Sequence, residues 1–238
     1  MSLSEQELSE KTVEAVKKYV PKFKVISKET SWFHKTIGAI LKVFGNPSYM
    51  ENYFTTIGYT VAMPKGTTYL NWRATWHEAG HGLQAKKWTR LLFGALYLQG
   101  TPVWLVAAAL LCWPFFVWLP WWADVAFLAV FALLSFPPFG YWRAHWELQM
   151  YGMSLAVRHW NGYTIDEGYI NDRSKEFTTG FYFWMCPFPK LVKKKLQRYH
   201  DQAQSGEIFK GRYGYFYAHA YKTMKDLGLV KVPATVEP

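Results

Sequence analysis

Cysteine is scarce in this chain of 238 residues, which has only Cys112 and Cys186. They form no Cys-x-x-Cys motif, so no disulfide framework can be read, and a reducing compartment is the mild inference. A long apolar leader is missing as well, because the first twenty residues are polar and charged. We therefore expect no cleavable signal peptide at this N-terminus.

Acidic residues are also few compared with basic residues. There are 17 Asp and Glu against 27 Lys and Arg, which gives a net charge of +10 and suits either nucleic acid or an anionic membrane surface. The charge is segregated, since Asp124 is the only charged residue between Leu91 and Trp142. This segregation favours a membrane over nucleic acid, and a hydrophobic content of 50% excludes general disorder.

Apolar periodicity, caps and breakers predict the elements of the chain. Residues rich in β-branched and aromatic types favour a strand over 53–63. We expect helices over 4–19, 30–44, 70–87 and 141–160, and a basic helix that begins near Pro187. That basic helix is open to two readings, one on anionic lipid and one as a solvated helix with a single packed edge.

The apolar stretch divides into two halves, 101–119 and 125–136, around a break at 120–124. Each half with its flanks has about 18 residues, near the lower limit for crossing a bilayer. Tryptophans lie near the ends and basic residues flank both halves, so we expect a transmembrane hairpin with both ends in the cytoplasm. The alternative is a buried helical hairpin in a soluble protein.

The segment TWHEAGHGLQ contains His77-Glu78-Ala79-Gly80-His81. Histidines at i and i+4 share one face of a helix and can bind one Zn²⁺ ion, while Glu78 takes a proton from the zinc-bound water. We expect Gly80 to leave room beside the metal. A chance occurrence on an ordinary helix is the alternative, since the motif is only moderately specific.

A catalytic zinc site needs a third protein ligand. No Asp, Glu or His occurs in the 15 residues after His81. An apolar hairpin brings the chain back to where it left, so the helix over 141–160 can lie beside the HEAGH helix. Glu147 is then the expected ligand, whereas His145 lies roughly opposite on its helix; alternatively, Glu147 pairs with Arg143.

HEAGH, an apolar hairpin and then RxxxE together resemble the membrane gluzincin metallopeptidases of the HtpX type over residues 53–160. Gln84 and Tyr151 also resemble a second pattern, found in small zincin-like proteins of phage and bacterial genomes. The resemblance implies an α+β fold: a mainly helical zincin-like domain with a small sheet and the inserted transmembrane hairpin. It also implies that the strand over 54–63 binds extended substrate along its edge, although a plain packed strand is as good a reading.

The sequence departs from the gluzincin pattern in two places. Met150 and Tyr151 stand where the family has Ala-Asp, and Cys186-Pro187 stands where a later His-Pro is expected. The residue that stabilises the oxyanion is therefore open, and the candidates are Tyr151, His159, His200 and His219.

These patterns predict a membrane-associated zinc metallopeptidase acting on a peptide or protein, with His77, His81 and Glu147 as ligands and the site on the cytoplasmic side. The rival is a non-catalytic component of a larger assembly, such as a phage particle or a secretion machine. Nucleic acid is not an expected partner, because no recognisable binding fold accompanies the charge. The expected units are an N-terminal helical segment (1–50), the strand and HExxH helix (51–100), the hairpin (101–138), and the Glu-ligand helix with the basic C-terminal region (139–238).

Overall fold

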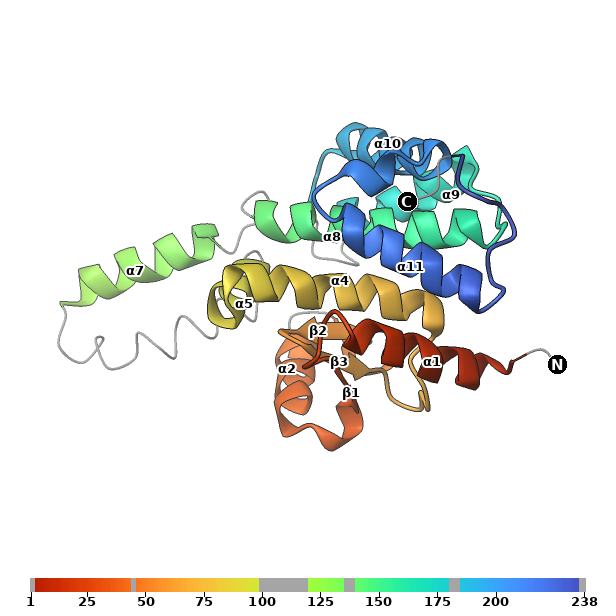
Figure 1. The fold of residues 1–238 in the computed structure, drawn as a ribbon. Coiled ribbons are helices and arrows are strands. Elements are labelled where there is room, and N and C mark those ends of the chain that lie inside the picture. Colours follow the sequence, from red (N-terminus) through yellow and green to blue (C-terminus); the bar gives the residue numbers. More distant parts are fainter. Residues whose placement is uncertain (1–2, 44–45, 99–119, 135–139, 180–184, 236–238) are drawn as a thin grey trace.

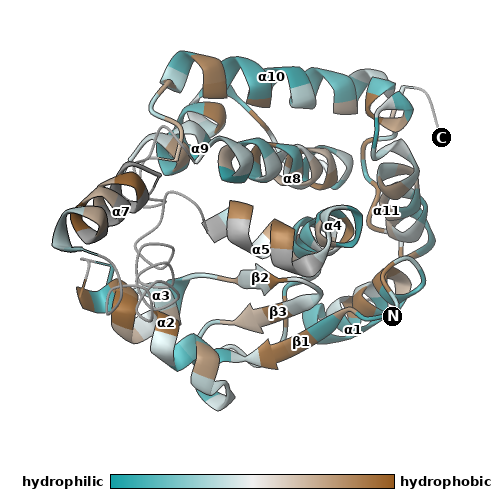
Figure 2. Cartoon of the chain, turned by 90° about the vertical axis from the view of Figure 1, so that its left-hand side faces the viewer, coloured by the Kyte–Doolittle hydropathy of each residue, from teal (hydrophilic) through white to brown (hydrophobic). Residues whose placement is uncertain are grey.

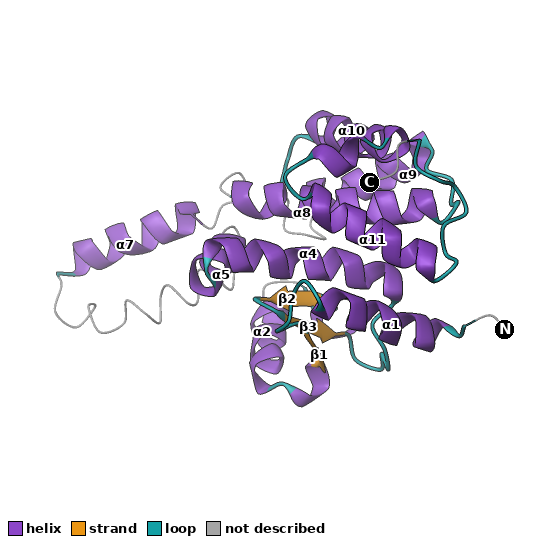
Figure 3. Cartoon of the chain, in the orientation of Figure 1, coloured by secondary structure: helices purple, strands orange, loops and turns teal. Residues whose placement is uncertain are grey.

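The computed structural model describes residues 3–43, 46–98, 120–134, 140–179 and 185–235. The described part is mostly helical and has one small sheet (Figures 1 and 3). The strands are β1 (Lys24–Ser27), β2 (Thr55–Ile57) and β3 (Thr60–Met63). The helices are α1 (Glu5–Lys17), α2 (Trp32–Val43), α3 (Tyr49–Asn52), α4 (Trp72–Trp88), α5 (Arg90–Leu98), α7 (Trp121–Leu134), α8 (Tyr141–Trp160), α9 (Glu167–Thr178), α10 (Pro189–Ser205) and α11 (Gly214–Asp226), with short 3₁₀ turns η1 (Lys28–Thr30) and η4 (Glu207–Lys210).

The sheet has the strand order β1-β3-β2, with β1 parallel and β2 antiparallel to β3. The single strand expected over 53–63 is wrong, because the segment folds into the β2–β3 hairpin. Gly58 has a φ of 64°, a conformation that glycine adopts without steric cost, and it opens the two-residue turn that reverses the chain. Strand β1 is an element that the sequence pattern did not predict.

Helices α4 and α8 form the centre of the molecule. Figure 1 shows the sheet and α2 on one side of α4, with α8 to α11 on the other. The pair is antiparallel, because His77 meets Ser154 while Gln84, two turns further along α4, meets Gln149. Fully buried Trp72, Trp76 and Trp160 belong to the main core, and burying such large side chains anchors both helices.

Helix α10 has one packed edge. Val192, Leu196, His200 and Ala203 are buried along one edge, and α10 packs against α8 and α9. Hydrophilic residues are frequent along α10 in Figure 2; Lys190 and Lys194 are exposed, whereas Lys193 and Lys195 are partly buried. The packed edge is what the second reading expects, and contact of the basic side with anionic lipid stays a prediction.

The expected transmembrane hairpin is wrong. Among the described residues no helix is long and apolar enough to cross a membrane. Residues 125–134 of the second half belong to α7, and 135–136 lie outside the described residues. The 14 residues of α7 span about 21 Å at the rise of an α-helix, well short of a hydrocarbon core of about 30 Å. The half over 101–119 lies outside the described residues.

Candidate metal centre

Helix α4 carries the first three residues of the site. Asn71 caps the helix, with its side chain accepting a hydrogen bond from the backbone N–H of Arg73. The i and i+4 spacing brings the imidazoles of His77 and His81 together, with ring centroids 5.1 Å apart. The HEAGH segment is thus a helix in which both histidines face the same neighbour, α8.

Helix α8 brings Glu147 to these histidines. The carboxylate Oε2 lies 3.5 Å from His77 Nε2 and 3.6 Å from His81 Nε2. The other oxygen, Oε1, accepts a hydrogen bond from the Tyr97 hydroxyl. Oε2 is buried and has no hydrogen-bond partner among the described residues, which is a costly state for a charged oxygen unless a cation satisfies it.

The three ligand atoms fit a zinc ion in their spacing. Tetrahedral ligands bound at about 2.0–2.1 Å lie about 3.4 Å from one another, and the two measured separations are 3.5 and 3.6 Å. All three atoms lie within 4.8 Å of one another, and His77, His81 and Glu147 are the set that the described residues offer for a metal ion. Two neutral imidazoles and one carboxylate are also the donors that zinc accepts at catalytic sites.

Both imidazoles are held so that Nε2 faces the site. His77 Nδ1 lies 2.9 Å from Ser154 Oγ, and His81 Nδ1 lies 2.9 Å from Gln84 Oε1. When Nδ1 carries the proton and donates it to these oxygens, the lone pair of Nε2 is free for a metal. Gln84, which the second sequence pattern singled out, also donates to Gln149 Oε1 on α8 and so ties the two helices together.

The pKa values of Glu147 and His81 are coupled, because the carboxylate and the imidazole are buried beside each other. Burial acts to raise the pKa of Glu147, but His81 and His77 outweigh it and hold that pKa well below its usual range. Burial acts to lower the pKa of His81, yet the carboxylates of Glu147 and Glu78 raise it overall. Without a metal ion, the buried carboxylate of Glu147 is therefore held ionised by the positive charge of the two histidines, a charge that a metal cation between them can replace.

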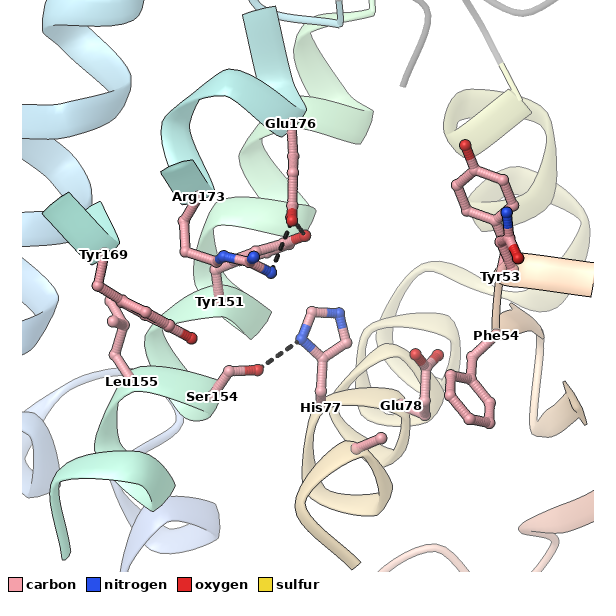
Figure 4. A pocket seen from close by; sticks show the side chains of 12 residues that line it. Tyr53, Phe54, His77, Glu78, Tyr151, Ser154, Leu155, Tyr169, Arg173 and Glu176 are labelled. Carbon is pink, nitrogen blue, oxygen red and sulfur yellow. Dashed lines mark hydrogen bonds and ion pairs between the residues drawn. The ribbon is translucent and has the colours of Figure 1, made fainter. Parts of the chain in front are cut away.

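A cleft of about 390 Å³ opens beside the three candidate ligands. His77 and Glu78 line it, while His81 and Glu147 are buried behind it. Figure 4 shows Glu78 next to Phe54 on one wall, with Tyr151, Arg173 and Glu176 across from them. Glu78 accepts a hydrogen bond of 2.5 Å from Thr56 Oγ1 of β2, which orients the carboxylate next to His77.

Helix α9 supplies a wall of the cleft that the sequence did not predict. Arg173 and Glu176 form an ion pair of 2.6 Å, and Glu176 also accepts a hydrogen bond from the Tyr151 hydroxyl. Burial raises the pKa of Glu176, although Tyr151 and Arg173 partly counteract it. Asp166 caps α9 and is a local signal for its start. The packing of α9 against α10, and of its Phe177 against Tyr151 of α8, has no local pattern in the sequence.

Of the four candidates for stabilising the oxyanion, the structure places Tyr151 in the cleft, with its ring 5.3 Å from that of His77. The others lie elsewhere: His159 contacts His200 between α8 and α10, and His219 lies 3.1 Å from Ala15 O. His145 points away from the ligands as well, stacking on Tyr141. Cys186 is buried in a separate apolar cluster.

The structure corrects two further expectations, which concern Gly80 and the substrate-binding strand. Gly80 does not leave room beside the metal, because a Cβ there would overlap the Met150 sulfur of α8. The extended segment expected to bind substrate is divided, with β2 at the sheet edge next to α4 and β3 in the centre. Edge binding of a substrate strand stays a prediction, and it now concerns β2.

Comparisons with protein-family models, curated proteins and solved structures found no match for this chain.

Proposed function

We propose that this chain is a zinc-dependent metallopeptidase in which His77, His81 and Glu147 hold the metal and Glu78 is the general base. The observation that carries the proposal is the buried Oε2 of Glu147, which lies 3.5 and 3.6 Å from the two Nε2 atoms, next to an open cleft, and accepts no hydrogen bond from the described residues. Zinc at such a site supplies a Lewis acid and lowers the pKa of water toward about 7.

In the proposed mechanism, each residue of the cleft has a distinct role. Glu78 follows His77 directly and faces the cleft, where Thr56 orients its carboxylate. The carboxylate takes a proton from the attacking water. The same proton then passes from Glu78 to the leaving amine, so that the carboxylate returns to its starting state. The Tyr151 ring lies 5.3 Å from that of His77 in the cleft, and its hydroxyl donates to Glu176. We assign this hydroxyl to the developing oxyanion, which it reaches by exchanging the Glu176 contact for the substrate oxygen.

The arrangement favours a catalytic site over the purely structural one of the rival hypothesis. Structural zinc sites are closed by four protein ligands, whereas catalytic sites use three and keep one position open. The described residues offer three ligands, and His77 borders the cleft. The HExxH motif also places the Glu78 carboxylate beside the cleft, and a structural zinc site has no need of a carboxylate there.

Glu78→Gln tests the proposal. The amide keeps the shape of the side chain but cannot accept the proton, so we expect hydrolysis of an unfolded protein such as casein to fall by roughly a hundredfold or more. Zinc content should stay at the wild-type level, because Glu78 is not a ligand. Glu10→Gln, an exposed change on α1, is the matched control; zinc-loaded Glu78→Gln that cleaves at the wild-type rate would refute the mechanism.

A further inference from the structure

Three arginines and two tyrosines alternate along one line that leads out of the cleft. The Cζ of Arg73 lies 5.3 Å from the Tyr163 ring centroid, and that of Arg158 lies 4.9 Å from the same ring. Arg158 also lies 4.3 Å from the Tyr169 ring, which Arg173 approaches at 5.4 Å. We call these five residues, Arg73, Tyr163, Arg158, Tyr169 and Arg173, the arginine–tyrosine strip.

The strip continues the catalytic cleft. Tyr169 and Arg173 line the cleft together with His77 and Ser154. Arg73 precedes His77 by four residues on α4, and Arg158 follows Ser154 by four on α8. Because these two helices are antiparallel, both arginines lie beyond the same end of the site. The four helical residues between each arginine and the site rise about 6 Å, which is close to the span of two residues of an extended peptide, about 7 Å. The arginines therefore lie about two peptide residues from the site.

The arginines keep hydrogen-bonding capacity for a ligand. Among the described residues no ion pair includes Arg158, whose Nε donates to Thr164 O at 3.4 Å. Arg73 donates one N–H to the Tyr163 hydroxyl at 3.0 Å and pairs with Glu5 at 3.8 Å, with side chains 34% and 48% exposed. Each guanidinium has further N–H groups for a ligand. Stacking on a tyrosine occupies the face of a guanidinium and leaves its edge, which matches a carboxylate in a two-pronged geometry. Arg173 differs, because it is paired with Glu176 at 2.6 Å.

From this geometry we propose that the strip binds acidic side chains of a polypeptide lying in the cleft, about two residues from the bond that is cut. The inference rests on the proposed peptidase function and adds the substrate class: segments rich in Asp and Glu. The excess of 27 basic over 17 acidic residues in the chain acts in the same direction, since it attracts such segments at long range.

Single-stranded nucleic acid is the competing ligand, because alternating basic and aromatic side chains also bind its phosphates and bases. The continuity of the strip with His77 and Glu78 favours a peptide, since those residues face the same cleft. The two ligands give different results in one binding experiment.

The experiment uses zinc-loaded Glu78→Gln protein, which holds peptide without turnover. Fluorescence anisotropy measures its affinity for a labelled peptide containing several Glu, for the same peptide with Gln in their place, and for a single-stranded DNA of similar length. We expect the Glu peptide to bind best. Adding Arg158→Gln or Arg73→Gln should weaken it by roughly threefold to fivefold each, as partly exposed charge pairs do.

Two further variants control this result. Arg158→Lys keeps the charge and should retain part of the affinity, which separates a binding role from misfolding. Arg212→Gln is matched, because Arg212 is exposed and lies 6.0 Å from a tyrosine ring away from the cleft, and it should leave affinity unchanged.

Equal affinity for the Glu and Gln peptides, or insensitivity to both arginine changes, would overturn the inference. So would tighter binding of the DNA with the same sensitivity to Arg158→Gln, which would make the strip a nucleic-acid surface. Because this readout does not need catalysis, failure of the peptidase proposal shows separately, as absence of casein cleavage by the wild type.

Discussion

At the scale of single residues, each side chain of the proposed metal site has two polar atoms. One faces the metal position, and the other bonds to a neighbouring residue. Glu147 uses Oε1 for Tyr97 and keeps Oε2 for the histidines. The histidines direct Nδ1 to Ser154 and Gln84 and keep Nε2 for the site. A metal site of this kind is defined as much by these outer partners as by its ligands.

Removing the outer partners tests that account. We expect Gln84→Ala and Ser154→Ala to weaken zinc binding by roughly 10- to 100-fold each, because the imidazole then loses the hydrogen bond that fixes its orientation. Competition with a chromophoric chelator measures the affinity. Gln197→Ala on the exposed side of α10 serves as the control, and unchanged affinity in both site variants would show that the rings are held by packing alone.

The sequence predicted the residues whose spacing is local and missed those that depend on packing. His77 and His81 follow from the i and i+4 spacing, and Glu147 followed from the return of the chain after the apolar stretch. Ser154 and Arg173 reach the cleft only because of how α8 and α9 are placed against α4. No nearby pattern encodes those positions, so they could not be predicted.

At the scale of elements, the close contact of α4 with α8 decides whether the ligands meet. Gly80 lies where the two helices touch, and the Met150 side chain fills the space that a Cβ would need. Any added atom must displace Met150 or move α8, and with it Glu147. The glycine within HEAGH therefore serves helix packing.

Gly80→Ala measures the importance of this contact. Despite the better helix propensity of alanine, we expect the free energy of unfolding to fall by about 1–3 kcal/mol from overpacking, together with weaker zinc binding. Urea unfolding with and without zinc is the measurement. Gly94→Ala on α5 is the matched control, because a Cβ there meets nothing within 4 Å; equal stability of the two variants would contradict the packing role.

Element prediction succeeded where the signals were local. The helix expected over 141–160 coincides with α8, which stops at Asn161 and Gly162. The strand over 53–63 became a hairpin because one glycine permits a turn that alternation of side chains does not reveal. The expected membrane span relied on apolar content, which does not fix the length of a helix.

At the scale of the whole molecule, the sheet side and the helical side form the two walls of the cleft. Buried Lys28 stabilises the first wall, donating to the backbone oxygens of Tyr49 and Tyr53. Next to it, His34 Nδ1 lies 2.8 Å from the Tyr49 hydroxyl. Burial, with a further contribution from Lys28, lowers the pKa of His34 to about 4.

This depressed pKa makes stability depend on pH. The unfolded chain protonates His34 near pH 6.5 and the folded chain only near 4, so the free energy of unfolding falls as pH drops through that window. We expect His34→Gln to reduce the loss between pH 7 and pH 5 by about 2 kcal/mol. Urea unfolding in the presence of EDTA measures this without interference from metal release; equal losses in both proteins would contradict it.

The central claim is that one metal ion lies between α4 and α8, and elemental analysis of purified protein tests it most directly. We predict about one zinc per wild-type chain and loss of that zinc in Glu147→Ala, with circular dichroism showing that both proteins are folded. Glu167→Ala, an exposed change on α9, should keep the metal. A folded wild type without zinc, or with iron in its place, or a Glu147→Ala variant that retains full zinc, would contradict the account.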